Sequence, residues 1–576
     1  MGLKAKVNID LSAIVSDALA LVSIWLKDLG RVVKEAGVLN KLGFGEHHSD
    51  ATAGAATVLC TLAAIWIAYT WMLSFRMSLK LLRLSRTVPC VKGGWPVLGH
   101  VPKLANGAPW DVMTAWAKEY GSIYRFKIFG KENVVVSDPA YMKEVMRNKV
   151  TKYHKDIEVA YRPFLSLLGT GIVTSDGKKW RRQRNKVSSA FRIEVLSEVP
   201  SMAQRAVARL AKKLDKEAER GGSVEIGEDM RHLTLQVISE ALMSLSPEEA
   251  DGTFATVYMP IVFEGHKRTW NPLRRFFPLL PAWWAHIENQ RILNDYITGI
   301  IRRRWDSAQE TVHRATDAPD GNGVSIGAAN GSGEGAEGVP KRKRDILDKV
   351  LDSVEPGEWG KATMLQIRDE MKTFVLAGHE TSASMLNWTL FELTQNSDLM
   401  AKVLHESEEV FGPNASLTGP LPSVEKLRGL QFTEACLREA LRKYSLVPLV
   451  VRRCVEDTTI CGDGGEEHFI PKGCPVHLMI KGVHERPDLW PEPMRYDPSR
   501  FEKTIAPYTF LPFIDGPRNC LGQHLSLLES KVVLSLLVNR YKFSLLNENA
   551  AEPNAWIIPT ISKHGTHLAP ELRAAS

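Results

Sequence analysis

Residues 51–75 form an uninterrupted stretch of 25 residues without a charged side chain. As an α-helix, this stretch would be about 37 Å long, enough to cross a hydrocarbon layer of about 30 Å with some tilt. Trp66, Tyr69 and Trp71 cluster toward its C-terminal half, as aromatic residues do at a membrane surface. The pattern predicts one transmembrane anchor over 51–75. The alternative is a buried helix of a soluble core, which seldom contains so long an uncharged stretch.

The charges that flank this stretch predict its orientation. Six cations, among them Arg76, Lys80, Arg83, Arg86 and Lys92, follow it before the first acid, Asp111, whereas the cations that precede it are mixed with acids. Because positive charge concentrates on the cytosolic side of a membrane helix, we expect the long C-terminal part to face the cytosol. Residues 76–105 are predicted to form a basic, proline- and glycine-rich hinge, whose stiff, non-helical part runs from Pro89 to Pro102.

Residues 1–50 form an N-terminal extension with its own periodic pattern. Apolar residues recur at helical spacing between Leu11 and Val33, and charged residues occupy the other face. This pattern predicts an amphipathic helix lying on a membrane, and an extension that folds on itself remains equally open. A plastid transit peptide fits poorly, because the segment contains acids and is not rich in serine and arginine.

The rest of the chain, residues 106–576, has mixed patterns. Residues 122–129 and 133–137 alternate or run apolar on either side of a glycine-containing break, which predicts a β-hairpin. From about residue 178 onward helical patterns dominate, and residues 371–393 read as one long helix. Residues 308–340 have almost no large apolar side chain, so we expect a disordered surface loop there.

Composition narrows the class of protein. The 576 residues are 44% hydrophobic and 24% charged, which is ordinary for a globular protein and excludes a largely disordered chain. The net charge of +7 is not gathered into one block, so no nucleic-acid partner is expected, and the excess favours a membrane surface or an acidic protein partner. Seven cysteines without a C-x-x-C pair indicate neither a zinc site nor a disulfide framework.

One cysteine has unusual surroundings. Residues 513–522 read Phe-Ile-Asp-Gly-Pro-Arg-Asn-Cys-Leu-Gly, so Cys520 lies between glycines and beside an arginine. A lone cysteine is more often a small buried apolar residue, but a thiolate held in this way can be the proximal ligand of a haem iron. The segment resembles the cysteine-ligand loop of cytochromes P450, Phe-x-x-Gly-x-Arg-x-Cys-x-Gly, at every specified position. The resemblance makes Cys520 the iron ligand and implies cofactor contacts for Phe513, Gly516, Arg518 and Gly522.

Residues 377–382 read Ala-Gly-His-Glu-Thr-Ser within the predicted long helix. They resemble the oxygen-binding helix motif of the same family. The resemblance implies that Thr381 acts on dioxygen, that Glu380 relays protons from water, and that Gly378 makes room for the cofactor. An amphipathic helix with one glycine would be ordinary core, and it is the cysteine loop about 140 residues later that favours the functional interpretation.

Two further motifs follow the family's order. Glu439 and Arg442 lie three residues apart on one helix face, and residues 498–501 resemble the family's Pro-x-Arg-Phe segment. The resemblance implies a buried structural triad of Glu439, Arg442 and Arg500 behind the haem. Trp180 and Arg184 resemble a pair that meets a haem propionate. Arg452 is expected to be another propionate partner, with Arg453 as its neighbouring candidate.

The resemblance implies a cytochrome P450 fold, mainly α with smaller β-sheets, after a single N-terminal transmembrane helix. It also implies a monooxygenase with non-covalent haem b, since Ala377 replaces the glutamate that some relatives esterify to haem. NADPH-cytochrome P450 reductase or an equivalent donor would supply electrons at the endoplasmic reticulum membrane, with the catalytic domain in the cytosol. The substrate would be lipophilic, and a fatty acid, a sterol and a carotenoid remain open.

Two rival functions would also require Cys520. A family member that rearranges peroxides or dehydrates without O2, and a haem-binding sensor or carrier, need no threonine-centred proton relay. Thr381 therefore favours the monooxygenase.

Overall fold

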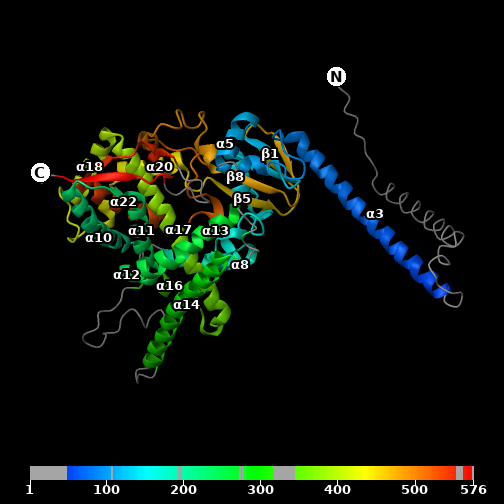
Figure 1. Ribbon diagram of the computed structural model, residues 1–576, viewed down its shortest axis with the longest axis horizontal. Helices are drawn as coiled ribbons and strands as arrows, with labels where there is room; N and C mark the ends of the chain where they lie inside the picture. Colours follow the sequence, from blue (N-terminus) through cyan, green and yellow to red (C-terminus); the bar gives the residue numbers. More distant parts are fainter. Residues whose placement is uncertain are drawn as a thin grey trace. The chain divides into compact units, whose positions relative to one another are not determined.

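The computed structural model describes residues 49–105, 108–191, 197–270, 274, 278, 280–316, 344–552 and 562–573. The amphipathic helix predicted within residues 1–50 lies outside the described residues, as do 317–343. The chain divides into two compact units, residues 1–86 and 87–576, which are described separately (Figure 1).

The first unit contains one long helix, α3 (Ser49–Thr87). Its segment Leu62–Thr87 is long and apolar enough to cross a membrane, and none of its most apolar window is buried. Large apolar side chains along it are exposed: Leu62, Ile65, Trp66, Ile67, Tyr69, Trp71, Leu73 and Phe75. A soluble protein seldom exposes so many together, so this helix has the character of the predicted anchor.

The hinge predicted for residues 76–105 begins later than expected. Residues 76–87 contain no proline or glycine and are rich in leucine and cations, so they continue α3. The helix therefore continues past the predicted end of the anchor, and the first part of the predicted hinge is helical. Residues 88–100 are non-helical as predicted, and the short helix α4 (Val101–Leu104) follows.

A central helix organises the second unit. This helix, α17 (Lys361–Thr394), begins ten residues before the predicted start at 371 and has its most extensive helix contacts with four other helices. They are α11 (Ile226–Met243), α14 (Pro281–Thr316), α20 (Gln431–Tyr444) and α22 (Gln523–Arg540). Helices α10 (Val199–Arg220) and α18 (Ser397–Phe411) pack around α22.

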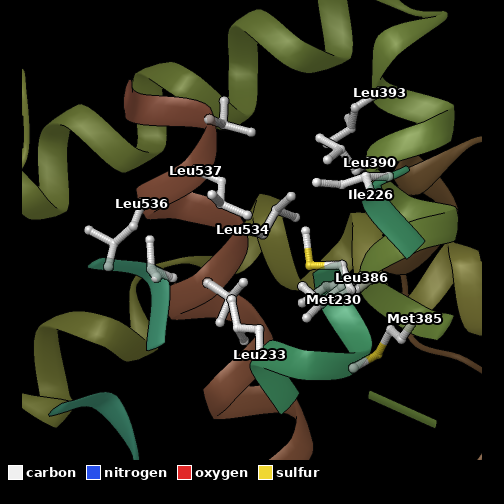
Figure 2. Packing of buried hydrophobic residues seen from close by; sticks show 14 of the residues in the cluster. Ile226, Met230, Leu233, Met385, Leu386, Leu390, Leu393, Leu534, Leu536 and Leu537 are labelled. Atoms are coloured by element: carbon white, nitrogen blue, oxygen red, sulfur yellow. The ribbon is translucent and has the colours of Figure 1, made fainter. Parts of the chain in front are cut away.

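The core lies where α11, α17 and α22 meet. Figure 2 shows buried leucines of α17 and α22 facing methionine, leucine and isoleucine side chains of α11. Trp388 of α17 is fully buried and stacks on Tyr444 of α20, with ring centroids 4.0 Å apart. This apolar packing fixes α17 against α22, which begins just after the cysteine loop.

The β-sheets form a smaller part of the second unit than the helices do, as predicted. A five-stranded sheet has the order β1-β2-β8-β5-β3, in which only β2 and β8 run parallel. Its strands are β1 (Ile123–Ile128), β2 (Lys131–Val136), β8 (Pro475–Met479), β5 (Leu449–Cys454) and β3 (Tyr153–Lys155). The other sheets are β4-β10-β9 (Val224–Glu225, His567–Leu572, Tyr541–Leu545) and β6-β7 (Thr458–Cys461, Glu467–Ile470).

The predicted hairpin is confirmed as the antiparallel pair β1–β2, joined by Phe129 and Gly130, both with positive φ. The predicted loop at 308–340 is wrong over its first residues, because α14 continues to Thr316. Residues 300–316 lack proline and glycine, so nothing interrupts the helix until Pro319 and Gly321. The remaining helices used below are α5 (Pro109–Tyr120), α7 (Leu165–Leu168), α8 (Gly177–Ser188) and α13 (Met259–Trp270).

Candidate active site

The cysteine loop has a shape that depends on a glycine. The backbone N–H of Cys520 donates to the carbonyl of Phe513 at 2.8 Å and closes the loop. Gly516 has a φ of 74°, and a Cβ there would lie 2.3 Å from the carbonyl oxygen of Met146. Any side chain at position 516 would strain the backbone there and would collide with the carbonyl group of Met146. The loop then leads directly into α22, two residues after Cys520 at the helix N-cap Gly522.

Cys520 is exposed to solvent, although protein surrounds its thiol closely. Desolvation by the surrounding protein raises the pKa of the Cys520 thiol, and the backbone amides of Gly522 and Gln523 and the charge of Arg184 oppose the rise. The N-terminus of a helix favours negative charge, so this end of α22 favours a thiolate ligand.

One face of α17 is also accessible to solvent. Ala377 is exposed and Gly378 and Thr381 are partly so, although most residues of α17 from 367 to 393 are buried. The Thr381 hydroxyl donates to the carbonyl of Ala377 at 2.6 Å. A Cβ at Gly378 would lie 2.7 Å from Ile238 of α11, so this glycine allows α11 and α17 to pack closely. The cofactor contact predicted for Gly378 stays a prediction.

The carboxylate of Glu380 is buried between α17 and α11. Arg231 of α11 lies 3.5 Å from one carboxylate oxygen, and its guanidinium also pairs with exposed Glu228. Burial raises the pKa of Glu380, and the charge of Arg231 opposes that rise. Glu228 at the surface, Arg231 and the buried Glu380 therefore form a series of charged groups that ends next to Thr381. The sequence could have shown the i, i+3 spacing of Glu228 and Arg231, but not that Arg231 reaches Glu380.

Cations surround the cysteine loop. Arg184 of α8 donates to the backbone and side-chain oxygens of Asn519, at 2.9 and 2.7 Å. Arg518 lies over the ring of Trp180, 3.8 Å from its centroid, and also pairs with Asp176. The structure thus brings Trp180, Arg184 and Arg518 together, and it ties α8 to the cysteine loop.

Arg452 is buried, and no carboxylate of the described residues lies within 4.0 Å of its guanidinium. Its neighbour Arg453 instead pairs with Asp156, so Arg452 is the better candidate of the two. A buried guanidinium without a carboxylate favours a site that receives an anionic group.

Sequence reasoning missed one cation of this group, Lys155. Strand β3 pairs with β5 so that Lys155 lies opposite Arg452. Its ammonium donates to the carbonyl of Val173 at 2.7 Å. Desolvation and the charges of Arg452 and Arg518 lower its pKa far below the usual value. Lys155, Arg452 and Arg518 thus form a cluster with excess positive charge.

The predicted triad is assembled in the structure. Glu439 and Arg442 are both fully buried and share two hydrogen bonds of 2.7 and 2.8 Å. Arg500 approaches the same carboxylate at 3.3 Å, without the alignment of a hydrogen bond. Arg442 also donates to the carbonyl of His484, and Glu439 accepts from the backbone of Asp497. The triad therefore joins α20 to the segment before the cysteine loop.

Comparison with known proteins agrees with this geometry. A family model described as Cytochrome P450 matches residues 89–560. The chain belongs to the cytochrome P450 family. Within it, the chain is 28% identical over 467 residues to "Cytochrome P450 4c21" of Blattella germanica, covering 79% of this chain and 87% of that protein.

Two other relatives come from a human and from a plant. Over 472 residues the chain is 26% identical to "Cytochrome P450 4V2" of Homo sapiens, covering 79% of this chain and 84% of that protein. Over 500 residues it is 26% identical to "Carotene epsilon-monooxygenase, chloroplastic" of Arabidopsis thaliana, covering 84% and 85%. The predicted resemblance and fold class are confirmed, and this P450 is a monooxygenase with a haem-thiolate cofactor.

The residues present fit such a cofactor. Cys520 supplies an accessible thiol, and a Cβ at Gly522 would meet open space, which leaves room beside the loop. Arg452 and its neighbouring cations suit the two carboxylates of a haem. Among the described residues, no group of three or more His, Cys, Asp or Glu side chains is placed to hold a metal ion.

Proposed function

We propose that this P450 inserts one oxygen atom of O2 into a fatty acid, sterol or carotenoid, using electrons that NADPH supplies through a separate reductase. The observation that carries the proposal is the accessible thiol of Cys520 in a chain whose α17 exposes Ala377 and Thr381. The cofactor would be haem b, held non-covalently through the Cys520 thiolate. Arg184, Arg452, Arg518 and Lys155 would hold its propionates, and Trp180 stacks on Arg518.

When bound, the haem supplies reductive activation of dioxygen. Cys520 would hold the iron as a thiolate, and the backbone amides of Gly522 and Gln523 stabilise that charged form. Thr381 presents a hydroxyl on the accessible face of α17 and holds a proton donor in position. Glu380, with a pKa above that of an exposed glutamate, passes protons toward Thr381. Gly516 and the backbone hydrogen bond from Cys520 to Phe513 maintain the shape of the cysteine loop.

The proposed redox partner would bind through charge. Helix α8 carries four exposed cations, Lys178, Lys179, Arg181 and Arg182, the last of which pairs with Glu358. The same helix holds the cysteine loop through Arg184. An acidic partner docked on this helix would lie near the cofactor. We also propose that α3 anchors the protein once in the endoplasmic reticulum membrane, with residues 87–576 in the cytosol. The cations of α3 that follow the apolar stretch support this orientation.

Oxygen-18 incorporation tests the proposed reaction. The full chain would be incubated with NADPH, a P450 reductase and one lipid of each class under oxygen-18 gas. We expect one product that carries a single heavy oxygen atom, detected by mass spectrometry, because the second atom leaves as water. A product whose new oxygen comes from water or from an added peroxide would contradict the proposal and favour the peroxide-rearranging rival.

A further inference from the structure

Two buried nitrogen atoms between α13 and α14 have no hydrogen-bond acceptor. Arg268 of α13 is 9% exposed, and its Nε donates to Glu264 at 3.0 Å, but its Nη2 has no partner. His286, near the start of α14, is 3% exposed, and its Nδ1 also has no partner. Buried donors are nearly always satisfied, so this pair points to a missing acceptor.

The Nδ1 atom of His286 must carry a hydrogen. The side-chain amide of Gln290 donates to the carbonyl of Ser166 at 2.7 Å and lies 2.9 Å from the His286 Nε2 atom. Because an amide nitrogen only donates, Nε2 accepts. Burial and the charge of Arg268 lower the pKa of His286 to about 4, so the ring is neutral at pH 7. A neutral imidazole has one N–H, which is then at Nδ1.

The charges of this cluster do not balance. Arg274 also binds Glu264, with Nη2 2.9 Å and Nε 3.3 Å from its two carboxylate oxygens. Two guanidinium groups thus share one carboxylate, while no second carboxylate among the described residues lies within 4.0 Å of either. With His286 neutral, the net charge is +1. Arg274 is partly exposed, so water screens part of this charge, but the buried guanidinium of Arg268 still favours an anionic partner.

The cluster lies close to the helix that carries Thr381. Helix α13 packs against α7 and against η4 (Arg162–Phe164), and α7 also contacts α17. Ser166, which binds Gln290, belongs to α7. A substrate that reaches the cluster from Thr381 would therefore extend along α17 toward Asp369, which binds the backbone of Thr170 just after α7.

We propose that Arg268 and His286 bind the carboxylate of the substrate, so that the enzyme selects carboxylate-ended lipophiles over neutral ones of the same chain. The guanidinium Nη2 and the imidazole Nδ1–H each donate to one carboxylate oxygen, which neutralises the cluster. This inference rests on the proposed function and chooses the fatty acid from its three substrate classes.

Binding measurements test the proposal. The dissociation constants of a fatty acid and of the alcohol with the same chain would be measured from the shift of haem absorption in the full chain. We expect the acid to bind more tightly, and R268Q to weaken the acid about tenfold or more while leaving the alcohol unchanged. Equal affinities in the parent protein, or equal losses for both ligands in R268Q, would overturn it.

Arg291 provides the matched control. It is an exposed arginine of α14 that pairs with Glu288 and Asp295 on the surface, so R291Q removes the same charge from outside the cluster. We expect R291Q to keep the parent ratio of acid to alcohol affinity, and a loss as large as that of R268Q would refute a specific site. H286F tests the second donor independently, with a smaller expected loss of acid binding. The CO difference spectrum of each variant is recorded as well. If the band near about 450 nm is present but acid and alcohol bind equally, the carboxylate site is refuted, whereas a missing band contradicts the proposed function itself.

Discussion

Replacing Glu439 with alanine is expected to prevent stable folding of the haem domain. The substitution leaves the guanidinium of Arg442, which is fully buried, without its carboxylate, and Arg500 loses the same partner. Removing one partner of a buried ion pair costs about 3–5 kcal/mol, and a whole domain has about 5–15 kcal/mol of stability. Because Glu439 also accepts from the backbone of Asp497, the chain before the cysteine loop loses an anchor as well. Thermal or urea unfolding measures the loss.

Arg495 gives the control for this experiment. It pairs with Glu492, and both side chains are largely exposed. An exposed ion pair contributes about 0–1 kcal/mol, so Arg495→Ala should unfold almost like the parent protein. A Glu439→Ala protein as stable as the Arg495→Ala protein would show that the buried triad does not hold the domain together.

Replacing Thr381 with alanine should separate reduction from product formation. The variant keeps Cys520 and its surroundings, so the thiolate spectrum should persist. Without the hydroxyl on the accessible face of α17, proton delivery is no longer guided, and product per NADPH should fall about a hundredfold, as for the loss of a general acid. Peroxide should account for most of the NADPH consumed. Parallel assays of NADPH, product and hydrogen peroxide measure this balance.

A second threonine of the same helix is a close control. The Thr389 hydroxyl donates to the carbonyl of Met385 at 2.7 Å, the same bond to the preceding turn that Thr381 makes, but Thr389 is fully buried. Thr389→Ala should therefore keep the parent yield of product per NADPH. If both alanine variants lose the same yield, the effect belongs to the helix and not to the hydroxyl of Thr381.

The motifs of this chain predicted more of the site than its periodicity did. Each motif identifies a few residues by their spacing in the sequence. The structure then brings Trp180 and Arg184 of one motif together with Arg518 of another, as the resemblance implied. The triad of Glu439, Arg442 and Arg500 could also be predicted, because Glu439 and Arg442 share one helix face. The resemblance already favoured Arg452 over Arg453, and the structure adds a physical reason, because Arg453 pairs with the buried carboxylate of Asp156.

The missed features depend on contacts between distant segments. Lys155 lies in a strand of three residues without a motif, and only its pairing with β5 places it opposite Arg452. Arg231 reaches Glu380 from another helix, and Gly378 packs on Ile238 of that helix. The end of α14 was predicted too early because a polar segment can be an exposed helix as well as a loop. The clustered donors Arg268 and His286 carry no sequence signal at all.

The CO difference spectrum of the reduced protein tests the central claim most directly, namely that Cys520 is the thiolate ligand of a haem. The full chain should give a band near about 450 nm, the signature of thiolate ligation. Cys520→Ser should lose that band, whereas Cys436→Ser should keep it, because Cys436 is buried in α20 among core residues. A parent protein without the band, or a Cys520→Ser protein that retains it, would contradict the account.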